Sequence, residues 1–340
     1  MMTVRSGRSF HRPALWLTVC SCLLALMGPC VDKPLAAEGA DGRTDTANTL
    51  FQLAFSTNMF TEVKVEDARA AMKVWMMTIA RERHIPIEPD IKVYDGIEQM
   101  LIASRNEPVE GFAVTAEECL RLREKIQMDR LVVGVHDGQI TEQYVVLVRK
   151  EGGIQKIGDL RDRSMTILEN PRMSLARVWL DTLLLEEGFQ SSAAFLKRTT
   201  AVNKLAQVVL PVFFRNSDAC LVTSRGFRTM SELNPQVGKQ LRVLAASPEV
   251  VPTVFVFRCD RVSPHRARMV NEMGRFPDSP AGQQILTLIQ ADRIIEQPLS
   301  CMTGAFDLLA AHQRLRAAKD RTKDVGVGLL PGETRPGGSR

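Results

Sequence analysis

The sequence lacks the short motifs that most often mark catalysis or nucleotide binding. It contains no G-x-S-x-G, H-E-x-x-H, P-loop or G-x-G-x-x-G pattern. Local signatures of acyl transfer, zinc hydrolysis and dinucleotide binding are therefore missing. The five histidines are scattered, without the spacing of metal ligands. The sequence thus predicts no catalytic residue, no metal site and no cofactor.

Cysteine is sparse and widely spaced. Three of the seven cysteines fall in the first 30 residues, and the others are Cys119, Cys220, Cys259 and Cys301. No C-x-x-C is present, so neither a zinc site nor a redox dithiol is indicated. Cys220 follows the pattern of a buried free thiol. A Cys259–Cys301 disulfide stays open as an alternative, because an oxidising compartment would permit one.

A strong excess of one charge is also missing. The 44 basic and 39 acidic residues of the chain become 40 and 38 once the four bases and one acid of the first 37 residues are set aside. A nucleic-acid-binding surface needs a larger excess, so no nucleic-acid partner is expected. With 45% hydrophobic and 24% charged residues in 340, the composition is that of a globular protein with room for two cores.

The N-terminus has the pattern of an export signal. Arg5, Arg8 and Arg12 precede an apolar run over residues 14–27, which is too short to span a membrane. The small residues ending at Ala37 offer a cleavage point. We therefore expect a signal peptide over 1–37, a disordered lead-in over 38–47 and a periplasmic protein, with retention of the signal as an open alternative.

The remaining chain alternates apolar strands with amphipathic helices, which indicates parallel strands joined by helical crossovers. Strands are predicted at 50–55, 91–94, 111–115, 131–136, 142–149, 165–168, 195–199, 218–223, 240–245 and 253–257. Helices are predicted at 66–82, 97–104, 116–126, 174–188, 201–210, 224–233, 263–276, 280–290 and 304–318. From residue 319 to 340 the apolar period is lost, and a disordered tail is expected.

The stretch Met165–Gly188 is the most informative. It reads as a strand, a polar turn containing Arg172, and a helix that Ser174 caps and Gly188 ends. A turn that leads into a helix N-terminus presents free N–H groups and a positive dipole, which suit an anion. The alternative is an ordinary strand-to-helix turn that binds nothing.

The order of these elements resembles the phosphate/phosphite/phosphonate substrate-binding proteins of ABC importers, which have the type 2 periplasmic binding-protein fold. The resemblance spans residues 50–311. It rests on Phe55-Ser56 followed by Val65–Trp75, on Tyr144–Ile154 with Ile157–Arg161, on the helix from Ser174 to Gly188, and on Asp218–Thr223.

The resemblance implies an α/β fold of two lobes, each a mostly parallel sheet flanked by helices, joined by two hinge strands. The first lobe would comprise residues 48–142 and 248–318, and the second 143–247. It also implies a small anionic ligand, clamped between the lobes of a monomer and delivered to an inner-membrane ABC permease.

Ligand-binding positions would lie at strand ends and helix starts. From the resemblance these are Ser56, Thr57, Tyr94, Asp95, Thr115, Asn170, Arg172, Ser174, Thr223 and Ser224.

One departure bears on the ligand. The family usually places a run rich in Ser, Thr and Gly at the start of the second-lobe helix, whereas this chain has Asn170–Leu175, in which only Ser174 keeps a hydroxyl. A larger or partly apolar anion held by Arg172 is therefore an alternative to a bare phosphate.

Two other functions stay open. The same fold could act as a ligand-sensing module for a membrane receptor. An exported hydrolase using His136 with Asp137 is a third hypothesis, although a hydrogen-bonded histidine in a turn is the favoured interpretation of His136.

Overall fold

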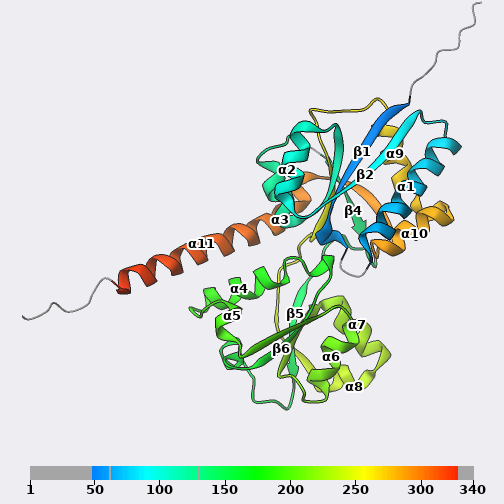
Figure 1. Cartoon of the computed structure of the whole chain (residues 1–340). Helices are drawn as coiled ribbons and strands as arrows, with labels where there is room; N and C mark the ends of the chain where they lie inside the picture. Colours follow the sequence, from blue (N-terminus) through cyan, green and yellow to red (C-terminus); the bar gives the residue numbers. More distant parts are fainter. Residues whose placement is uncertain (1–47, 61–62, 129, 328–340) are drawn as a thin grey trace, which may run out of the picture. The chain divides into compact units, whose positions relative to one another are not determined.

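A computed structural model describes residues 48–60, 63–128 and 130–327, with side chains described up to residue 321 (Figure 1). The expected signal peptide (1–37) and lead-in (38–47) lie outside the described residues. The described residues form two β-sheets flanked by helices. The predicted α/β class is confirmed.

The first sheet has six strands in the order β11-β4-β10-β3-β1-β2. These are β1 (Thr49–Ser56), β2 (Ile87–Tyr94), β3 (Val109–Thr115), β4 (Arg130–Val135), β10 (Thr253–Phe257) and β11 (Arg293–Pro298). The strand β1 pairs in parallel with β2 and β3, whereas β10 is antiparallel to β3 and β4, and β11 to β4. The sheet is therefore mixed, because β10 and β11, which follow the second sheet in the chain, run against the other strands.

The second sheet has five strands in the order β7-β6-β8-β5-β9. These are β5 (Tyr144–Arg149), β6 (Ser164–Leu168), β7 (Arg198–Val202), β8 (Ala219–Thr223) and β9 (Leu241–Ala246). The strand β6 pairs in parallel with β7 and β8, so the carboxyl ends of these three strands meet at one edge. The strand β5 is antiparallel to β8 and β9.

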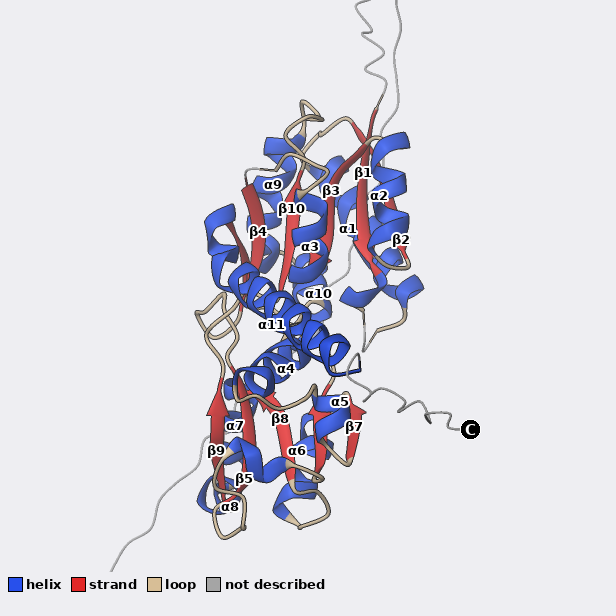
Figure 2. Ribbon diagram, turned by 90° about the vertical axis from the view of Figure 1, so that its left-hand side faces the viewer, coloured by secondary structure: helices blue, strands red, loops and turns tan. Residues whose placement is uncertain are grey.

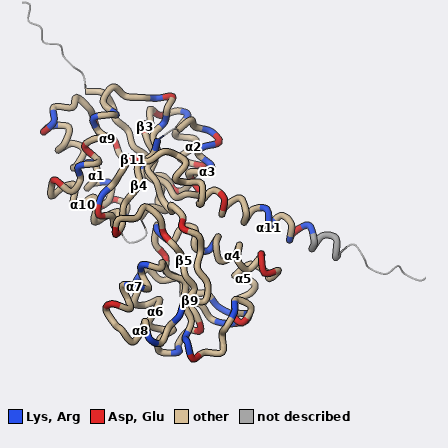
Figure 3. Tube along the Cα trace, turned by 180° about the vertical axis from the view of Figure 1, so that it is seen from behind, with Lys and Arg blue, Asp and Glu red and all other residues tan. Residues whose placement is uncertain are grey.

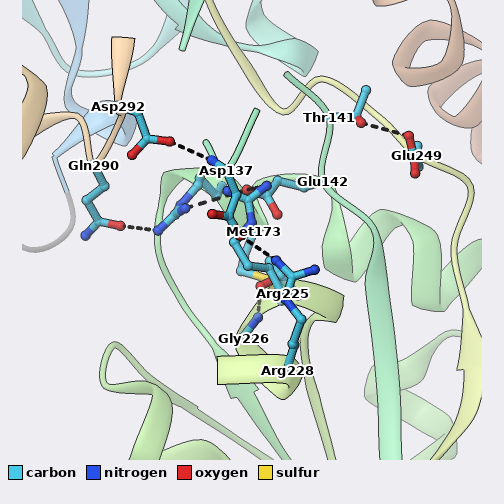
Figure 4. Close-up of polar contacts among 12 residues, drawn as sticks. Asp137, Thr141, Glu142, Met173, Arg225, Gly226, Arg228, Glu249, Gln290 and Asp292 are labelled. Carbon is cyan, nitrogen blue, oxygen red and sulfur yellow. Dashed lines mark hydrogen bonds and ion pairs between the residues drawn. The ribbon is translucent and has the colours of Figure 1, made fainter. Parts of the chain in front are cut away.

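Two crossing segments join the sheets. One runs from β4 to β5 and the other from β9 to β10, and they pair through an isolated bridge between Glu142 and Val250. The backbone N–H of each residue donates to the carbonyl of the other, at 2.8 and 3.0 Å. The Thr141 hydroxyl donates to the Glu249 carboxylate at 2.9 Å beside this bridge (Figure 4).

Helices cover both sheets (Figure 2). Around the first sheet are α1 (Val65–Glu82), α2 (Ile97–Asn106), α3 (Ala116–Arg123), α9 (Arg266–Gly274) and α10 (Pro280–Leu288). Around the second are α4 (Ala176–Glu186), α5 (Ser192–Phe195), α6 (Leu205–Phe213), α7 (Ser224–Leu233) and α8 (Pro235–Gln240). The last helix, α11 (Thr303–Val327), contacts both α3 and α4.

Two apolar clusters form the core. One contains residues of both sheets, such as Val114, Leu131, Ile167 and Leu221, together with Leu309 of α11. The other is confined to the first sheet and its helices and includes Leu53, Trp75 and Ile294. Burial of these side chains is the main source of stability in each half.

The predicted start of the helix near Ser174 is wrong. A short 3₁₀ turn, η3 (Pro171–Met173), precedes α4, and the Asn170 side chain caps that turn by accepting from the Met173 N–H at 3.2 Å. The Ser174 hydroxyl instead donates to the Pro252 carbonyl at 2.9 Å. Gly188 does end the helix with a φ of +80°, a conformation that glycine adopts without strain.

Other boundaries also differ from the sequence predictions. The predicted strand at 195–199 is displaced to β7, because Phe195 closes the short helix α5. The strand β11 was not predicted. The predicted tail begins too early, since α11 continues through residues 319–327. Its helical period extends past the apolar part, which is why composition alone misplaced the end.

Candidate functional site

The carboxyl ends of β6, β7 and β8 surround a polar cavity of about 610 Å³, called the polar cavity below. The N-termini of α6 and α7 begin beside it, at Leu205 and Ser224. Its walls are Leu168, Asn170, Arg172, Asn203, Lys204, Leu205, Thr223, Arg225, Gly226, Thr229 and Gln290. The site therefore lies where an α/β sheet ordinarily binds its ligand.

The charged side chains that line the polar cavity are all positive. Arg172, Lys204 and Arg225 contribute to its walls, and no Asp or Glu does among the described residues. Along the rest of the described trace, basic and acidic residues are interspersed (Figure 3). The positive character is thus local, as a near-neutral chain with an anion site requires.

One buried carboxylate, Glu142, faces both arginines. Its Oε1 lies 3.6 Å from Arg172 Nη1 and 3.7 Å from Arg225 Nη2, and its side chain is only 3% exposed. At these distances Oε1 has no hydrogen-bond partner. Loss of hydration raises the pKa of Glu142, and the two guanidinium groups offset that rise only in part.

Hydrogen bonds of both its side chain and its backbone hold Arg172 in position. Its Nη2 donates to the Gln290 side-chain oxygen at 2.6 Å, and its carbonyl accepts from the Tyr144 hydroxyl at 3.0 Å. Tyr144 is fully buried in β5. The guanidinium group is therefore held between the polar cavity and the residue that follows α10.

A second, apolar cavity of about 140 Å³ lies within the first sheet and its helices. It is called the apolar cavity below. Its walls include Leu53, Trp75, Met76, Ala113 and Phe276, all buried apolar residues. Arg172 and Gln290 line this cavity as well as the polar one, so the two cavities share a wall.

His136 stands at the polar end of the apolar cavity. Burial, together with the nearby positive charges of Arg172 and Arg225, lowers the pKa of its imidazole to about 4. The ring is therefore neutral at pH 7. The Asp137 carboxylate pairs with Arg228, not with His136, and the Asp137 N–H donates to Asp292 at 2.6 Å. The His136–Asp137 pair expected of a hydrolase is not formed.

A comparison with known protein families identifies the family of this chain. The profile described as "ABC transporter, phosphonate, periplasmic substrate-binding protein" matches residues 60–298, most of the described chain. The chain belongs to this family. The expected resemblance to the phosphonate-binding proteins of ABC transporters is confirmed, and no curated protein matches the sequence significantly.

Solved structures of the same fold agree with the family at low identity. A binding protein component of a phosphonate ABC transporter from Pseudomonas aeruginosa is 11% identical with a TM-score of 0.53, over 80% of this chain and 89% of that one. A Xanthomonas citri protein bound to ATP is 15% identical with a TM-score of 0.56, over 79% and 99%. PhnD1 from Prochlorococcus marinus, in complex with methylphosphonate, is 14% identical with a TM-score of 0.50, over 76% and 97%. The type 2 periplasmic binding-protein fold is confirmed.

The phosphonate-family fold brings three of the ten predicted site residues to the polar cavity: Asn170, Arg172 and Thr223. The Thr223 hydroxyl caps α7 by accepting from the Gly226 N–H at 3.0 Å. Ser224 follows Thr223, and its N–H donates to the Gln143 carbonyl. Neither Ser174 nor Ser224 lines either cavity.

The five predicted residues of the first sheet line neither cavity; they are Ser56, Thr57, Tyr94, Asp95 and Thr115. Thr57 donates to Asp95 at 3.2 Å, and the Tyr94 hydroxyl donates to Glu107 at 3.2 Å. Burial, together with the charge of Glu107, raises the pKa of Tyr94. These side chains are engaged with one another or with their own sheet.

A buried carboxylate, Glu118, occupies the donors that end β1 and β3. Its Oε1 accepts from the Ser56 hydroxyl at 2.6 Å and from the Asn58 amide at 2.8 Å. Its Oε2 accepts from the N–H and the hydroxyl of Thr115 at 2.9 and 3.0 Å. Four donors that an external anion could use are thus satisfied within the chain.

Sequence reasoning missed six polar residues of the site: Glu142, Asn203, Lys204, Arg225, Thr229 and Gln290. Arg225 directly follows two predicted positions at the start of α7, so the helix start itself pointed to it. Among the described residues, no cluster of His, Cys, Asp and Glu has metal-site geometry, and no helix is long and apolar enough to cross a membrane. Cys119, Cys220 and Cys301 are free thiols, and Cys220 is buried as predicted.

Proposed function

We propose that the chain is a periplasmic solute-binding protein that holds a small oxyanion in the polar cavity and delivers it to an ABC permease. The observation that carries this proposal is the lining of that cavity, where Arg172, Lys204 and Arg225 meet no acid among the described wall residues. The family supplies the transport role, since its members are periplasmic substrate-binding components of phosphonate transporters.

The electrostatics favour an anion even with Glu142 ionised. Three positive side chains then oppose one negative side chain, and an oxyanion brings the site closer to neutrality. Arginine suits this task because its planar fork can donate two parallel hydrogen bonds to one acid group. The N-termini of α6 and α7 begin beside the same cavity, and their helix dipoles add partial positive charge there.

The geometry supports recognition by hydrogen bonding as well as by charge. Asn170, Asn203 and Thr229 bring amide and hydroxyl donors to the wall. A tetrahedral acid group such as a phosphonate, phosphate or sulfonate offers several oxygen acceptors to these donors. Two of the similar structures were solved with phosphate-containing or phosphonate ligands, ATP and methylphosphonate. We infer an acid group of this class for the present chain.

The two sheets would act as lobes, 48–142 with 248–318 and 143–247, that rotate about the crossing segments around Glu142 and Val250. We propose that the protein works as an exported monomer, cleaved near Ala37, whose ligand-bound form the permease recognises. Ser56, Thr57, Tyr94, Asp95, Thr115, Ser174 and Ser224 would then stabilise the lobes near the ligand rather than touch it.

A thermal-shift screen of residues 38–340 tests the proposal with phosphate, methylphosphonate, sulfate, methanesulfonate and acetate. A ligand at 100 times its dissociation constant stabilises the fold by about 2.7 kcal/mol. We expect at least one of the phosphorus or sulfur oxyanions to raise Tm. No shift with any of them, at concentrations up to tens of millimolar, would overturn the proposal.

Substitution of two arginines of α7, one that lines the polar cavity and one that does not, tests the site. Arg225→Ala removes a charged donor from the wall and should weaken the best ligand by about 10- to 100-fold. Arg228→Ala lies on the same helix, but Arg228 is exposed, pairs with Asp137 and lines neither cavity, so affinity should stay unchanged. Equal affinity in both variants would remove Arg225 from the site.

A further inference from the structure

The apolar cavity has no role in binding the acid group itself. Its walls include aliphatic and aromatic side chains of β1, β3, α1 and α10, and the polar residues His136, Arg172, Thr253 and Gln290 lie among them. A bare phosphate there would lose its hydration without gaining enough donors. The cavity is suited instead to an apolar group.

The two cavities meet at one pair of side chains. Arg172 and Gln290 line both of them and are joined by the 2.6 Å hydrogen bond between Nη2 and Oε1. A ligand with its acid group beside Arg172 therefore has the apolar cavity directly across this pair. The neutral His136 adds no charge there.

Apart from the apolar cavity, the first sheet has few hydrogen-bond donors available to an external anion. The donors at the ends of β1 and β3, which are Ser56, Asn58 and Thr115, already bind the Glu118 carboxylate. In this chain the first sheet thus presents an apolar space to the ligand, while the second presents charge. This division requires a ligand with two chemically different ends.

Building on the proposed function, we propose that the ligand is an amphipathic oxyanion. Its acid group is held by Arg172, Lys204 and Arg225 in the polar cavity, and its compact apolar group enters the apolar cavity past the Arg172–Gln290 pair. The substrate class is an aryl or short-chain alkyl phosphonate or sulfonate rather than inorganic phosphate.

The size of the apolar cavity limits the apolar group. A cavity of about 150 Å³ in another protein holds one benzene molecule, and the apolar cavity here measures about 140 Å³. A phenyl ring or an alkyl chain of similar volume therefore fits, whereas a long acyl chain does not.

Paired ligands test the proposal by isothermal titration calorimetry. Phenylphosphonate is compared with methylphosphonate, and benzenesulfonate with methanesulfonate, because each pair keeps the acid group and changes only the apolar group. Burial of the ring should tighten binding by about tenfold or more. Equal affinity within both pairs overturns the proposal but leaves the proposed function standing. Failure of every oxyanion to bind overturns both.

Trp75 locates the apolar group. It lines the apolar cavity and is 3% exposed, and Trp179 is the only other tryptophan after residue 37. In a Trp179→Phe variant, phenylphosphonate should change the Trp75 emission, whereas methylphosphonate should leave it nearly unchanged. Tighter binding of phenylphosphonate without a change at Trp75 would place the ring elsewhere and overturn the proposal.

Substitutions that fill the apolar cavity test whether it holds the apolar group of the ligand. Ala113→Leu extends a side chain into it from β3, and Ile289→Trp narrows it from the partly exposed end of α10. Either should remove the advantage of phenylphosphonate and preserve methylphosphonate binding. Ile102→Trp, at an exposed position outside both cavities, is the control. If Ala113→Leu does not fold, Ile289→Trp still decides, and an advantage that survives it overturns the proposal.

Discussion

Glu142 acts on the proposed site as an internal competitor for the ligand. Its carboxylate is buried, lacks a hydrogen bond at Oε1 and stands 3.6–3.7 Å from two guanidinium groups. A buried carboxylate with loosely placed partners is stabilised less than one in direct contact with them. An external oxyanion that reaches the same arginines can therefore take over their interaction with Glu142.

This competition predicts a pH-dependent affinity. Burial raises the pKa of Glu142, and a bound anion nearby raises it further, so binding is accompanied by proton uptake. Affinity should then fall as the pH rises through the raised pKa, where Glu142 loses its proton. Titration with a sulfonate, whose own charge is constant over this range, measures the effect by calorimetry.

Glu142→Gln removes the competing charge and keeps the shape of the side chain. We expect tighter binding than in the wild type, by about tenfold for one unfavourable charge contact, and no pH dependence in the same range. Glu249→Gln alters an exposed carboxylate on the other crossing segment and serves as the control. Weaker binding by Glu142→Gln would show that the carboxylate supports the arginines rather than competing with the ligand.

At single residues, the sequence predicted side chains that line the polar cavity only where local rules apply. Arg172 and Asn170 were found because they follow the end of an apolar strand. Glu142 could not be found, because its position beside both arginines depends on the pairing of two segments more than 100 residues apart. Gln290 reaches the site through a contact with Arg172 across 118 residues. No local pattern encodes such contacts.

Among the secondary-structure elements, the Glu118 network ties the end of β1 to the start of α3. The Thr115–Glu118 pair forms a capping box, and the same carboxylate also binds Ser56 and Asn58 beyond β1. One side chain therefore fixes two strand ends of the first sheet. The spacing of Thr115 and Glu118 was visible in the sequence, whereas its second set of partners was not.

Glu118→Ala should lower the free energy of unfolding by about 2–4 kcal/mol, because it leaves buried donors without an acceptor. Sulfate or phosphate should restore part of this loss by binding the vacated donors, and urea unfolding with and without sulfate measures both effects. Glu117→Ala, at the exposed neighbouring position, should change neither quantity. Equal stability of the two variants would contradict this role for the network.

Errors in the predicted element boundaries explain why Asn203 and Lys204 were missed. A helix predicted from residue 201 conceals the loop at Asn203 and Lys204, since β7 runs to Val202 and α6 begins only at Leu205. The strand β7 is short and mostly exposed, with little apolar alternation to reveal it. The strands β3, β8 and β10 were predicted with nearly correct bounds, because they are apolar and buried along almost their whole length.

Across the whole molecule, one apolar cluster includes residues of both sheets, and α11 belongs to it. Leu308 and Leu309 are buried there together with residues of α3 and α4. His312 lies 4.0 Å from Asp181 of α4, and Arg123 of α3 stacks on the Phe306 ring. The last helix therefore links the stability of the two halves.

Leu309→Ala should lower the free energy of unfolding by about 2–4 kcal/mol through the cavity it creates. Both halves should still unfold together, because they share the damaged cluster. Variants that keep only Trp75 or only Trp179 report on the first and second sheets separately by fluorescence. Arg314→Ala, exposed on the same helix, is the control, and two separated transitions in the wild type would contradict the coupling.

The bridge between Glu142 and Val250 has a mechanical consequence. Both backbone groups of Glu142 are bound to the other crossing segment, and its side chain faces the arginines of the polar cavity. A ligand that draws those arginines away from the carboxylate would change the interactions of the segment about which the lobes would turn. Glu142 would then couple occupancy of the polar cavity to the conformation of the hinge.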